Sequence, residues 1–212
     1  MKVSLANTNP ALISIFKDPD QTITLDANFL IPPDRYPITS WKFDFSTFRN
    51  VWLDPIFNAF PKLAIHESVN SELVGSSIRN FVDSKNKKDP PEIIIHRDSD
   101  LNVTEKILRD TIETKIYPHT RYQPLLNNKD DRGEVKSLSY IAAKGIIFFA
   151  ANDNNAIQLI EKSEEWSTGL DSIQAVKMYE LIFYLYRKEL ADKDALRGLY
   201  KYQYRITSRE RL

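Results

Sequence analysis

Short aliphatic runs alternate with longer helix-like segments along this chain, and the alternation restricts the possible fold more than any other feature. Runs of β-branched or aliphatic residues occur at 22–25, 63–65, 93–95 and 146–150. They lack the three-to-four-residue spacing of helices, so we expect short buried strands. Segments with helical spacing separate them. This order predicts an α/β fold with three layers, α/β/α, around a mainly parallel central sheet.

The expected helices fill much of the remaining chain. Apolar spacing predicts helices at about 44–60, 68–81, 102–117, 131–144, 156–160 and 171–190. Pro55 should divide the first of these, because proline suits the first turn of a second helix. The third should direct one face to the core: Val103, Ile107, Leu108, Ile112 and Ile116. Leu12 to Phe16 fits either a short helix or an edge strand.

Two further segments have distinctive local signals. The last predicted helix opens with Asp171-Ser-Ile-Gln174, which resembles a capping box, and is apolar almost all round. Such a helix is usually buried on more than one side, here under the sheet or in a dimer contact. Three prolines between positions 32 and 37 exclude a regular helix there and predict a loop at 31–40.

Composition removes several classes of function. The chain has 212 residues, is 42% hydrophobic and contains 29 basic and 29 acidic residues, so its net charge is zero. Any binding of nucleic acid must therefore depend on a local patch. The absence of cysteine excludes disulfides, thiol catalysis and cysteine-ligated zinc. No apolar run approaches the length of a membrane span and no signal-peptide pattern is present, so we expect a cytoplasmic protein with no membrane partner.

Acidic residues follow two of the predicted strands. Asp26 comes directly after the first strand, and Asp153 closely follows the fourth. Because the carboxyl ends of parallel strands meet at one edge of a sheet, these side chains should lie close together. Each acid alone would equally fit as the cap of the next helix.

Other acids should reach the same edge from helices. Glu67 and Glu72 lie in the helix after the second strand, whereas Asp130, Asp131 and Glu134 open the helix before the fourth. Asp131 and Glu134 are three residues apart and share one helix face. Clustered carboxylates repel one another unless a cation joins them.

The ligand chemistry of this group favours a hard cation. Oxygen ligands without cysteine or paired histidine suit Mg²⁺ or Mn²⁺. His66, His96 and His119 have no partner at metal-ligand spacing, so we expect surface or hydrogen-bonded histidines. With phosphate as the natural co-ligand, the cluster predicts hydrolysis of a phosphodiester, with two metals roughly 3.5–4 Å apart activating water and stabilising the leaving oxygen.

The C-terminal segment carries a basic pattern. Arg197, Lys201, Arg205 and Arg209 are four residues apart, and Tyr200 and Tyr204 follow the same period. In a helix they would form a basic stripe flanked by aromatic rings, suited to the phosphates and bases of RNA. A solvated surface helix or a frayed tail fits the same pattern equally well.

Four motifs resemble those of PIN-domain nucleases, in the same order. The opening strand is TITLDANFLI, and the second motif is LAIHESVNSELV. The third and fourth are DRGEVKSLSYIAAKGIIFFAANDNNAI, in the variant with Asp-x-Gly-Glu, preceded by PPEIII. The resemblance covers about residues 20–160. It implies a PIN-like domain at 1–165 with an N-terminal extension at 1–20, and a C-terminal helical extension at 166–212 packed on the same domain.

The resemblance also implies a function and a set of site residues. PIN-domain proteins are metal-dependent endoribonucleases, often toxins of toxin–antitoxin pairs and often dimers. By the motif match, the catalytic residues are Asp26, Glu72, Asp131, Glu134 and Asp153. All of these except Asp131 would bind Mg²⁺ or Mn²⁺ directly; Asp131 would act directly or through another ligand. Asn28 and Asn152 would orient carboxylates or water.

Two alternatives remain open from the sequence. A non-catalytic PIN-like module would bind RNA or a protein partner through the aromatic-rich segment 41–60 and the apolar C-terminal helix, and would not bind Mn²⁺ tightly. A structure-specific DNA nuclease is the third option, although no duplex-reading motif supports it. Competition between RNA and DNA would distinguish it from the endoribonuclease.

Overall fold

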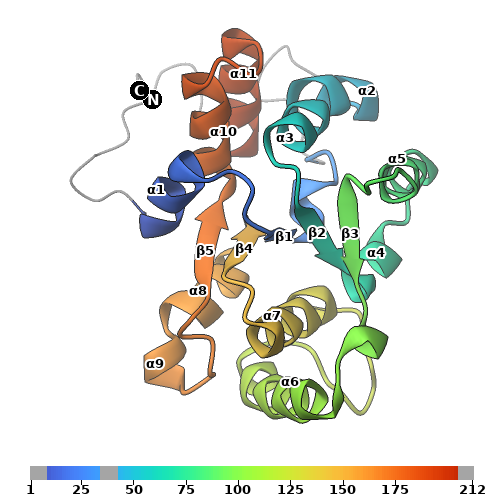
Figure 1. Ribbon diagram of the computed structural model, residues 1–212, viewed down its shortest axis with the longest axis vertical. Helices are drawn as coiled ribbons and strands as arrows, with labels where there is room; N and C mark the ends of the chain where they lie inside the picture. The colour runs from blue at the N-terminus through green and yellow to red at the C-terminus, as the bar shows by residue number, and fades with distance from the viewer. Residues whose placement is uncertain (1–8, 34–42, 205–212) are drawn as a thin grey trace.

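The computed structural model describes residues 9–33 and 43–204, and a five-stranded sheet forms its centre (Figure 1). All neighbouring strands pair in parallel, in the order β3-β2-β1-β4-β5. The strands are β1 (Ile23–Leu25), β2 (Leu63–His66), β3 (Ile93–His96), β4 (Phe148–Ala151) and β5 (Gln174–Lys177). The predicted α/β fold with a parallel sheet is confirmed, with one strand more than expected.

Helical segments connect and cover the strands. The α-helices are α1 (Pro10–Lys17), α2 (Phe45–Phe48), α3 (Asp54–Ala59), α4 (Glu67–Glu72), α5 (Ser76–Asn86), α6 (Val103–Ile116), α7 (Arg132–Lys144), α8 (Asn154–Glu161), α9 (Ser163–Trp166), α10 (Met178–Arg187) and α11 (Lys193–Gln203). Shorter turns are η2 (Ala27–Phe29), the π-helical η3 (Arg49–Leu53), η4 (Asp98–Asp100) and η5 (Tyr117–His119). No helix in the described ranges has both the length and the apolarity to cross a bilayer.

Successive residues of β4 face opposite helical layers. Phe148 and Ala150 join the core formed with α1–α3, α5, α10 and α11, whereas Phe149 and Ala151 join the core formed with α6–α9. Figure 1 shows the first group of helices above the sheet and the second group below it. A strand covered on both faces needs apolar residues at every position, which explains the continuous apolar run in the sequence. The three layers are therefore as predicted.

The strand order reverses beside β1. The chain runs from β1 to β2 and β3 on one side, and then α6 and α7 carry it back to β4 on the other side of β1. The backbone N–H of Asp26 donates to the carbonyl of Ala150 at 2.9 Å, so the ends of β1 and β4 are held together. Ligand sites in open parallel sheets form at the carboxyl ends of strands at such a reversal.

The single helix expected at 68–81 is wrong, because the structure has α4 and α5 there with a break between them. Leu73 leaves helical geometry at ψ 83°, and α5 begins after Gly75. Val74 and Gly75 are weak helix formers, which favours a break at this point. The predicted apolar face is nevertheless buried: Val69, Leu73, Ile78 and Phe81. The break leaves Glu72 as the last residue of α4.

Only two of the five residues predicted for the inner face of α6 are buried. Ile112 and Ile116 are buried, but Val103, Ile107 and Leu108 are exposed. Ion pairs of charged residues turn a different face of α6 toward the core. Glu113 is buried and accepts from Arg109, on its own helix, at 2.8 Å and from Lys136 of α7 at 3.3 Å.

The helix expected at 171–190 is also wrong at its beginning. Residues 174–177 form β5, where Ala175 and Val176 pair with Phe149 and Ala150 of β4. The capping box expected at Asp171 is absent from the described helices; α10 begins at Met178 instead. Pairing with the edge of β4 buries the apolar residues of this segment, and this tertiary interaction outweighs their tendency to form a helix.

Two ambiguous segments have definite structures. Leu12 to Phe16 lies in α1, which Asn9 caps by accepting from the N–H of Ala11. The segment 45–59 is helical throughout, and its regular part resumes at Asp54-Pro55 after the π-helical stretch. Most of the predicted loop at 31–40 lies outside the described residues, as do Arg205 and Arg209.

Candidate functional site

Asp26 and Asp153 lie at the ends of the two strands that meet at the reversal. Asp26 is 3% exposed and accepts from the side-chain amide of Asn28 at 2.9 Å. Asp153 accepts from the N–H of Asn155 at 2.7 Å. Each acid also caps the turn or helix that follows it. Burial above all, with a contribution from the charge of Asp153, raises the pKa of Asp26 to about 6.

Glu134 lies in the first turn of α7 and faces the same edge of the sheet. Its side chain is buried, and Oε2 has no hydrogen-bond partner. Burial raises its pKa most, followed by the negative charges of Asp26, Asp153, Asp131 and Glu72; together they raise it to about 9. These charges show that all five predicted acids lie close enough to interact.

Glu72 approaches the cluster from the end of α4. Its Oε1 is buried without a partner. Burial and then the charge of Asp26 raise its pKa to about 7, although the charge of Arg132 and the N–H of Gly133 oppose the shift. The carboxylate lies so close to α7 that a Cβ on Gly133 would be 2.8 Å from Oε1. The Asp-x-Gly-Glu motif thus needs glycine at this position for Glu72 to reach the cluster.

Asp131 differs from the other acids because its carboxylate is bound by an arginine side chain. It adopts a left-handed conformation with φ 53° immediately before α7. Its carboxylate accepts from Arg121 at 2.8 Å and 3.2 Å through the guanidinium and at 2.9 Å through the backbone N–H. The hydrogen bond from the Arg121 side chain is the main cause that lowers the pKa of Asp131. Of the two acids in the third motif, Glu134 has the unpartnered oxygen and Asp131 has a cationic partner.

The two asparagines have different partners. Asn28 holds Asp26, as described above, whereas the Oδ1 of Asn152 accepts from the hydroxyl of Tyr204 at 2.7 Å. The same hydroxyl accepts from the N–H of Tyr179 at 3.3 Å. Tyr204 therefore joins the end of α11 to the edge of the site, a contact that the spacing of the basic stripe did not indicate.

The described part of the basic stripe lies on α11. Arg197 is exposed and pairs with Asp194 at 3.1 Å and with the hydroxyl of Tyr186 at 3.3 Å. The rings of Tyr200 and Tyr204 are 5.1 Å apart, and Lys201 lies one residue after Tyr200. The helix ends at Gln203, before the predicted stripe does.

The acids interact electrostatically, but their oxygens are farther apart than the ligands of one metal ion. Within the described residues, one group of potential ligands has its donor atoms within 4.8 Å of one another, and it is His66, Glu67 and Asp98. The acidic cluster does not reach that spacing. Carboxylates without a cation repel one another, so a wider arrangement is the expected one.

Gly133→Ala should weaken Mn²⁺ binding at the cluster about tenfold or more without unfolding the protein. The new Cβ would displace the Glu72 carboxylate, whereas alanine itself favours the helix by up to about 1 kcal/mol. Calorimetric titration with Mn²⁺ and urea unfolding would measure the two effects. Gly75→Ala is the matched control, because its Cβ would make only an ordinary contact of 3.8 Å with Ile78. Equal Mn²⁺ affinity in both variants would contradict the prediction.

No family model, curated protein or solved structure matches this chain. The interpretation of the acids therefore depends on the order of the motifs in the sequence and on the geometry described above.

Proposed function

We propose that the protein is a Mg²⁺- or Mn²⁺-dependent endoribonuclease whose metal ligands are Asp26, Glu72, Glu134 and Asp153. One observation carries the proposal. The buried oxygens Oε1 of Glu72 and Oε2 of Glu134 have no partner, although the charge of Asp26 acts on both side chains and that of Asp153 acts on Glu134. A buried carboxylate without a partner requires a proton or a cation. An all-oxygen donor set fits a hard divalent ion.

Different residues would bind the ion and hold its ligands in position. A bound ion would supply Lewis-acid stabilisation of the phosphate and a more acidic water. Asn28 holds the carboxylate of Asp26 in place, and the close approach at Gly133 does the same for Glu72. Glu134 projects from the first turn of α7, within reach of the charges of Asp26 and Asp153.

Cations around the acids favour a polyanionic substrate. The charges of Arg132 and Lys129 act on Glu72, and Arg121 lies beside Asp131 with its side chain 73% exposed. In a chain of zero net charge, such a local group supplies the attraction for phosphates. Arg121, Lys129 and Arg132 interact with acids of the cluster. We therefore expect the phosphates of a bound RNA to contact these residues, near the beginning of α7.

Mn²⁺ calorimetry on the wild-type protein and on Asp26→Asn tests the proposal. We expect saturable binding by the wild type and none by the variant, because asparagine removes the charge and retains the cap. Asp171→Asn, which alters an exposed acid outside the cluster, is the control and should bind as the wild type does. Cleavage of labelled RNA in the presence of unlabelled RNA or DNA then tests the substrate. Absence of binding by the wild type would contradict the metal site.

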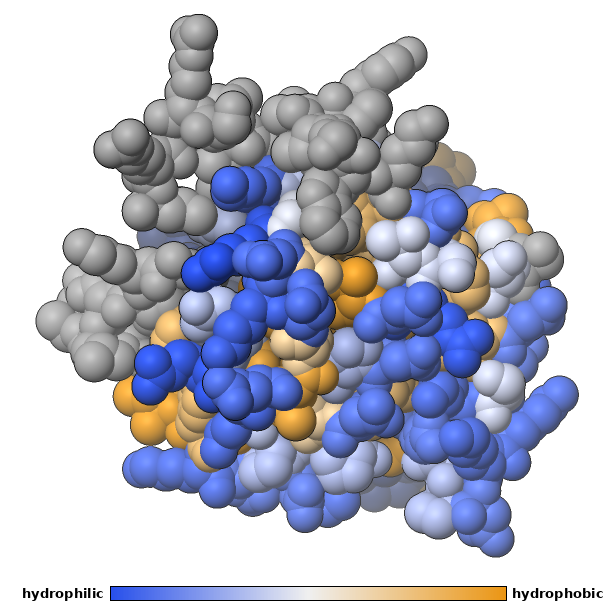
Figure 2. Space-filling model, turned by 90° about the horizontal axis from the view of Figure 1, so that it is seen from above, coloured by the Kyte–Doolittle hydropathy of each residue, from blue (hydrophilic) through white to orange (hydrophobic). Residues whose placement is uncertain are grey.

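The non-catalytic alternative has less support because several large apolar side chains of its two expected contact surfaces lie in the core of the described structure. In the segment 41–60, Phe48, Trp52 and Leu53 have no exposed surface, and in α10 the same is true of Leu181 and Leu185. Figure 2 looks down on this side of the molecule, where the described hydrophobic residues lie among hydrophilic ones.

A further inference from the structure

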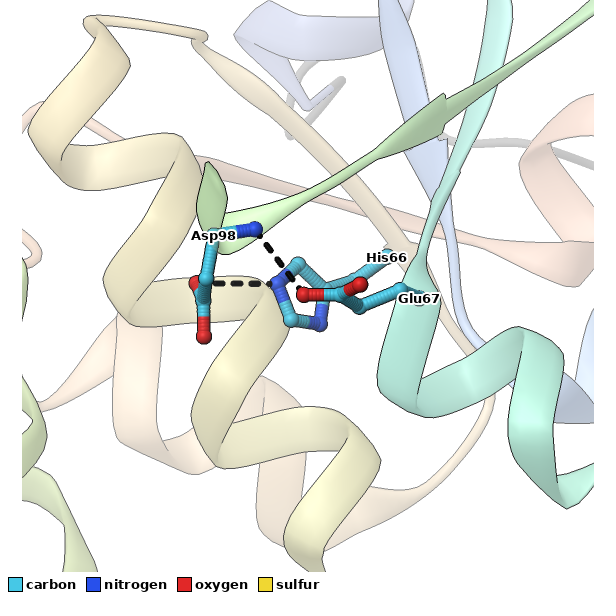
Figure 3. Close-up of side chains that lie close together, drawn as sticks. All are labelled: His66, Glu67 and Asp98. Carbon is cyan, nitrogen blue, oxygen red and sulfur yellow. Dashed lines mark hydrogen bonds and ion pairs between the residues drawn. The ribbon is translucent and has the colours of Figure 1, made fainter. Parts of the chain in front are cut away.

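A second group of polar side chains lies at the ends of β2 and β3. His66 ends β2, Glu67 begins α4, and Asp98 follows β3 in the turn η4. The strands are in register there, with His66 beside His96. Figure 3 shows the three side chains pointing toward one another from the two strand ends. His66 is 1% exposed, whereas Glu67 is on the surface.

Hydrogen bonds fix which nitrogen of His66 faces the other two residues. The N–H of Ser68 donates to Nδ1 at 3.2 Å, so Nδ1 is an acceptor and Nε2 carries the proton. Nε2 faces Oδ1 of Asp98 at 3.3 Å. The N–H of Asp98 donates to Oε1 of Glu67 at 2.9 Å. The contact between Nε2 and Oδ1 is long for a hydrogen bond of this type.

We propose that His66, Glu67 and Asp98 form a binding site for a zinc-class divalent metal, separate from the acidic cluster. Their donor atoms lie within 4.8 Å of one another. Two ligands of one tetrahedral zinc ion are about 3.4 Å apart, given metal–ligand distances of about 2.0–2.2 Å. The 3.3 Å separation of Nε2 and Oδ1 already matches this value. Glu67 is exposed, and its Oε1 accepts from the N–H of Asp98, so this hydrogen bond keeps its carboxylate beside the other two side chains.

The surroundings support a transition metal instead of Mg²⁺. Imidazole is a ligand for Zn²⁺, Co²⁺ and Ni²⁺, whereas Mg²⁺ prefers oxygen alone. When Nε2 binds a metal, its proton must move to Nδ1, which then donates to the hydroxyl of Ser68 at 2.7 Å and no longer accepts from the N–H of Ser68. Arg109 lies 3.5 Å from Oδ2, the other oxygen of Asp98, and so holds that carboxylate in orientation. Metal-bound histidines and carboxylates usually have such supporting partners.

Zn²⁺ titration of the 212-residue chain without an affinity tag tests the site, with two isosteric variants. Asp98→Asn still offers a carbonyl oxygen to Nε2, although it gives up the 3.5 Å ion pair with Arg109. Glu67→Gln still accepts from the N–H of residue 98, so both variants retain the hydrogen bonds within the group. Each should lower the Zn²⁺ affinity by at least about tenfold. Asp100→Asn, at an exposed acid in the same turn, is the matched control and should bind as the wild type does. The double variant Asp26→Asn with Glu134→Gln should also retain the zinc.

Imidazole ¹⁵N NMR supplies a second readout. With Zn²⁺ the His66 proton should move from Nε2 to Nδ1, and His66→Asn, which retains a good helix cap, identifies the signal. Wild-type Zn²⁺ affinity in Asp98→Asn and Glu67→Gln would overturn the proposal. So would loss of zinc only in the variant of Asp26 and Glu134, since the ion would then occupy the acidic cluster. This result is independent of whether the protein cleaves RNA.

Discussion

Glu134→Gln should stabilise the metal-free protein by about 3 kcal/mol at pH 7 and flatten its dependence on pH. The pKa of Glu134 rises from 4.5 to about 9 in the folded chain. The folded state therefore binds more protons than the unfolded state between these values, and its stability falls as pH rises through that window. At pH 7 the difference of about 2.5 pH units from the unfolded value corresponds to about 3 kcal/mol. Glutamine does not titrate and is free of this penalty.

Urea unfolding in chelator at about pH 5, 7 and 8.5 measures the effect. The wild type should lose stability across this series, and Glu134→Gln should lose much less. Some slope will remain, because Asp26 and Glu72 have folded pKa values of about 6 and about 7. Glu165→Gln, at an exposed position, is the control and should follow the wild type. An unchanged slope in Glu134→Gln would show that this side chain is not buried among charges.

Asp26→Asn combined with Asp153→Asn should abolish RNA cleavage and leave the fold intact. The double variant removes two of the four proposed ligands from the adjacent ends of β1 and β4. Metal ions supply several kcal/mol of transition-state stabilisation, so the rate should fall on the order of a thousandfold or more. The asparagine carbonyl can still accept from the N–H groups of Asn28 and Asn155, so both caps remain.

A gel assay of RNA cleavage in Mn²⁺ and circular dichroism of the same samples would measure both parts of this prediction. Asp171→Asn provides the control for a change of charge away from the cluster. Cleavage at the wild-type rate by the double variant would contradict the mechanism. Loss of cleavage together with loss of the folded spectrum would indicate a structural role for the two acids instead.

The local sequence pattern predicts the structure of a segment correctly where burial of apolar residues alone decides between helix and strand. The four predicted strands are present because continuous apolar runs between turns have few other stable environments. The segment 174–177 is a strand and not part of the predicted helix, because Ala175 and Val176 fit a helix equally well and only pairing with β4 makes them a strand. Val103, Ile107 and Leu108 follow helical spacing, yet the inward pairing of Arg109 and Glu113 turns them to solvent.

The acids of the candidate site were accessible to prediction because strand ends determine their positions. Asp26 and Asp153 follow neighbouring strands, and the fixed geometry of α7 brings Glu134 to them. Other contacts join residues that are distant in the chain and have no local signal. The hydroxyl of Tyr204 reaches Asn152, 52 residues away. His66 and Asp98 are 32 residues apart and meet only because β2 and β3 are neighbours, so metal-ligand spacing in the sequence could not reveal them.

The position of β5, α10 and α11 after β4 in the sequence has a consequence for biosynthesis. Leu181, Leu185, Leu196 and Leu199 complete the core above the sheet, and β5 covers the open edge of β4. Until these residues leave the ribosome, the nascent chain has an unpaired strand edge and an uncovered apolar face. Such intermediates are prone to aggregation and are typical clients of chaperones. The core above the sheet is therefore complete only once α11 has been translated, after all four proposed metal ligands.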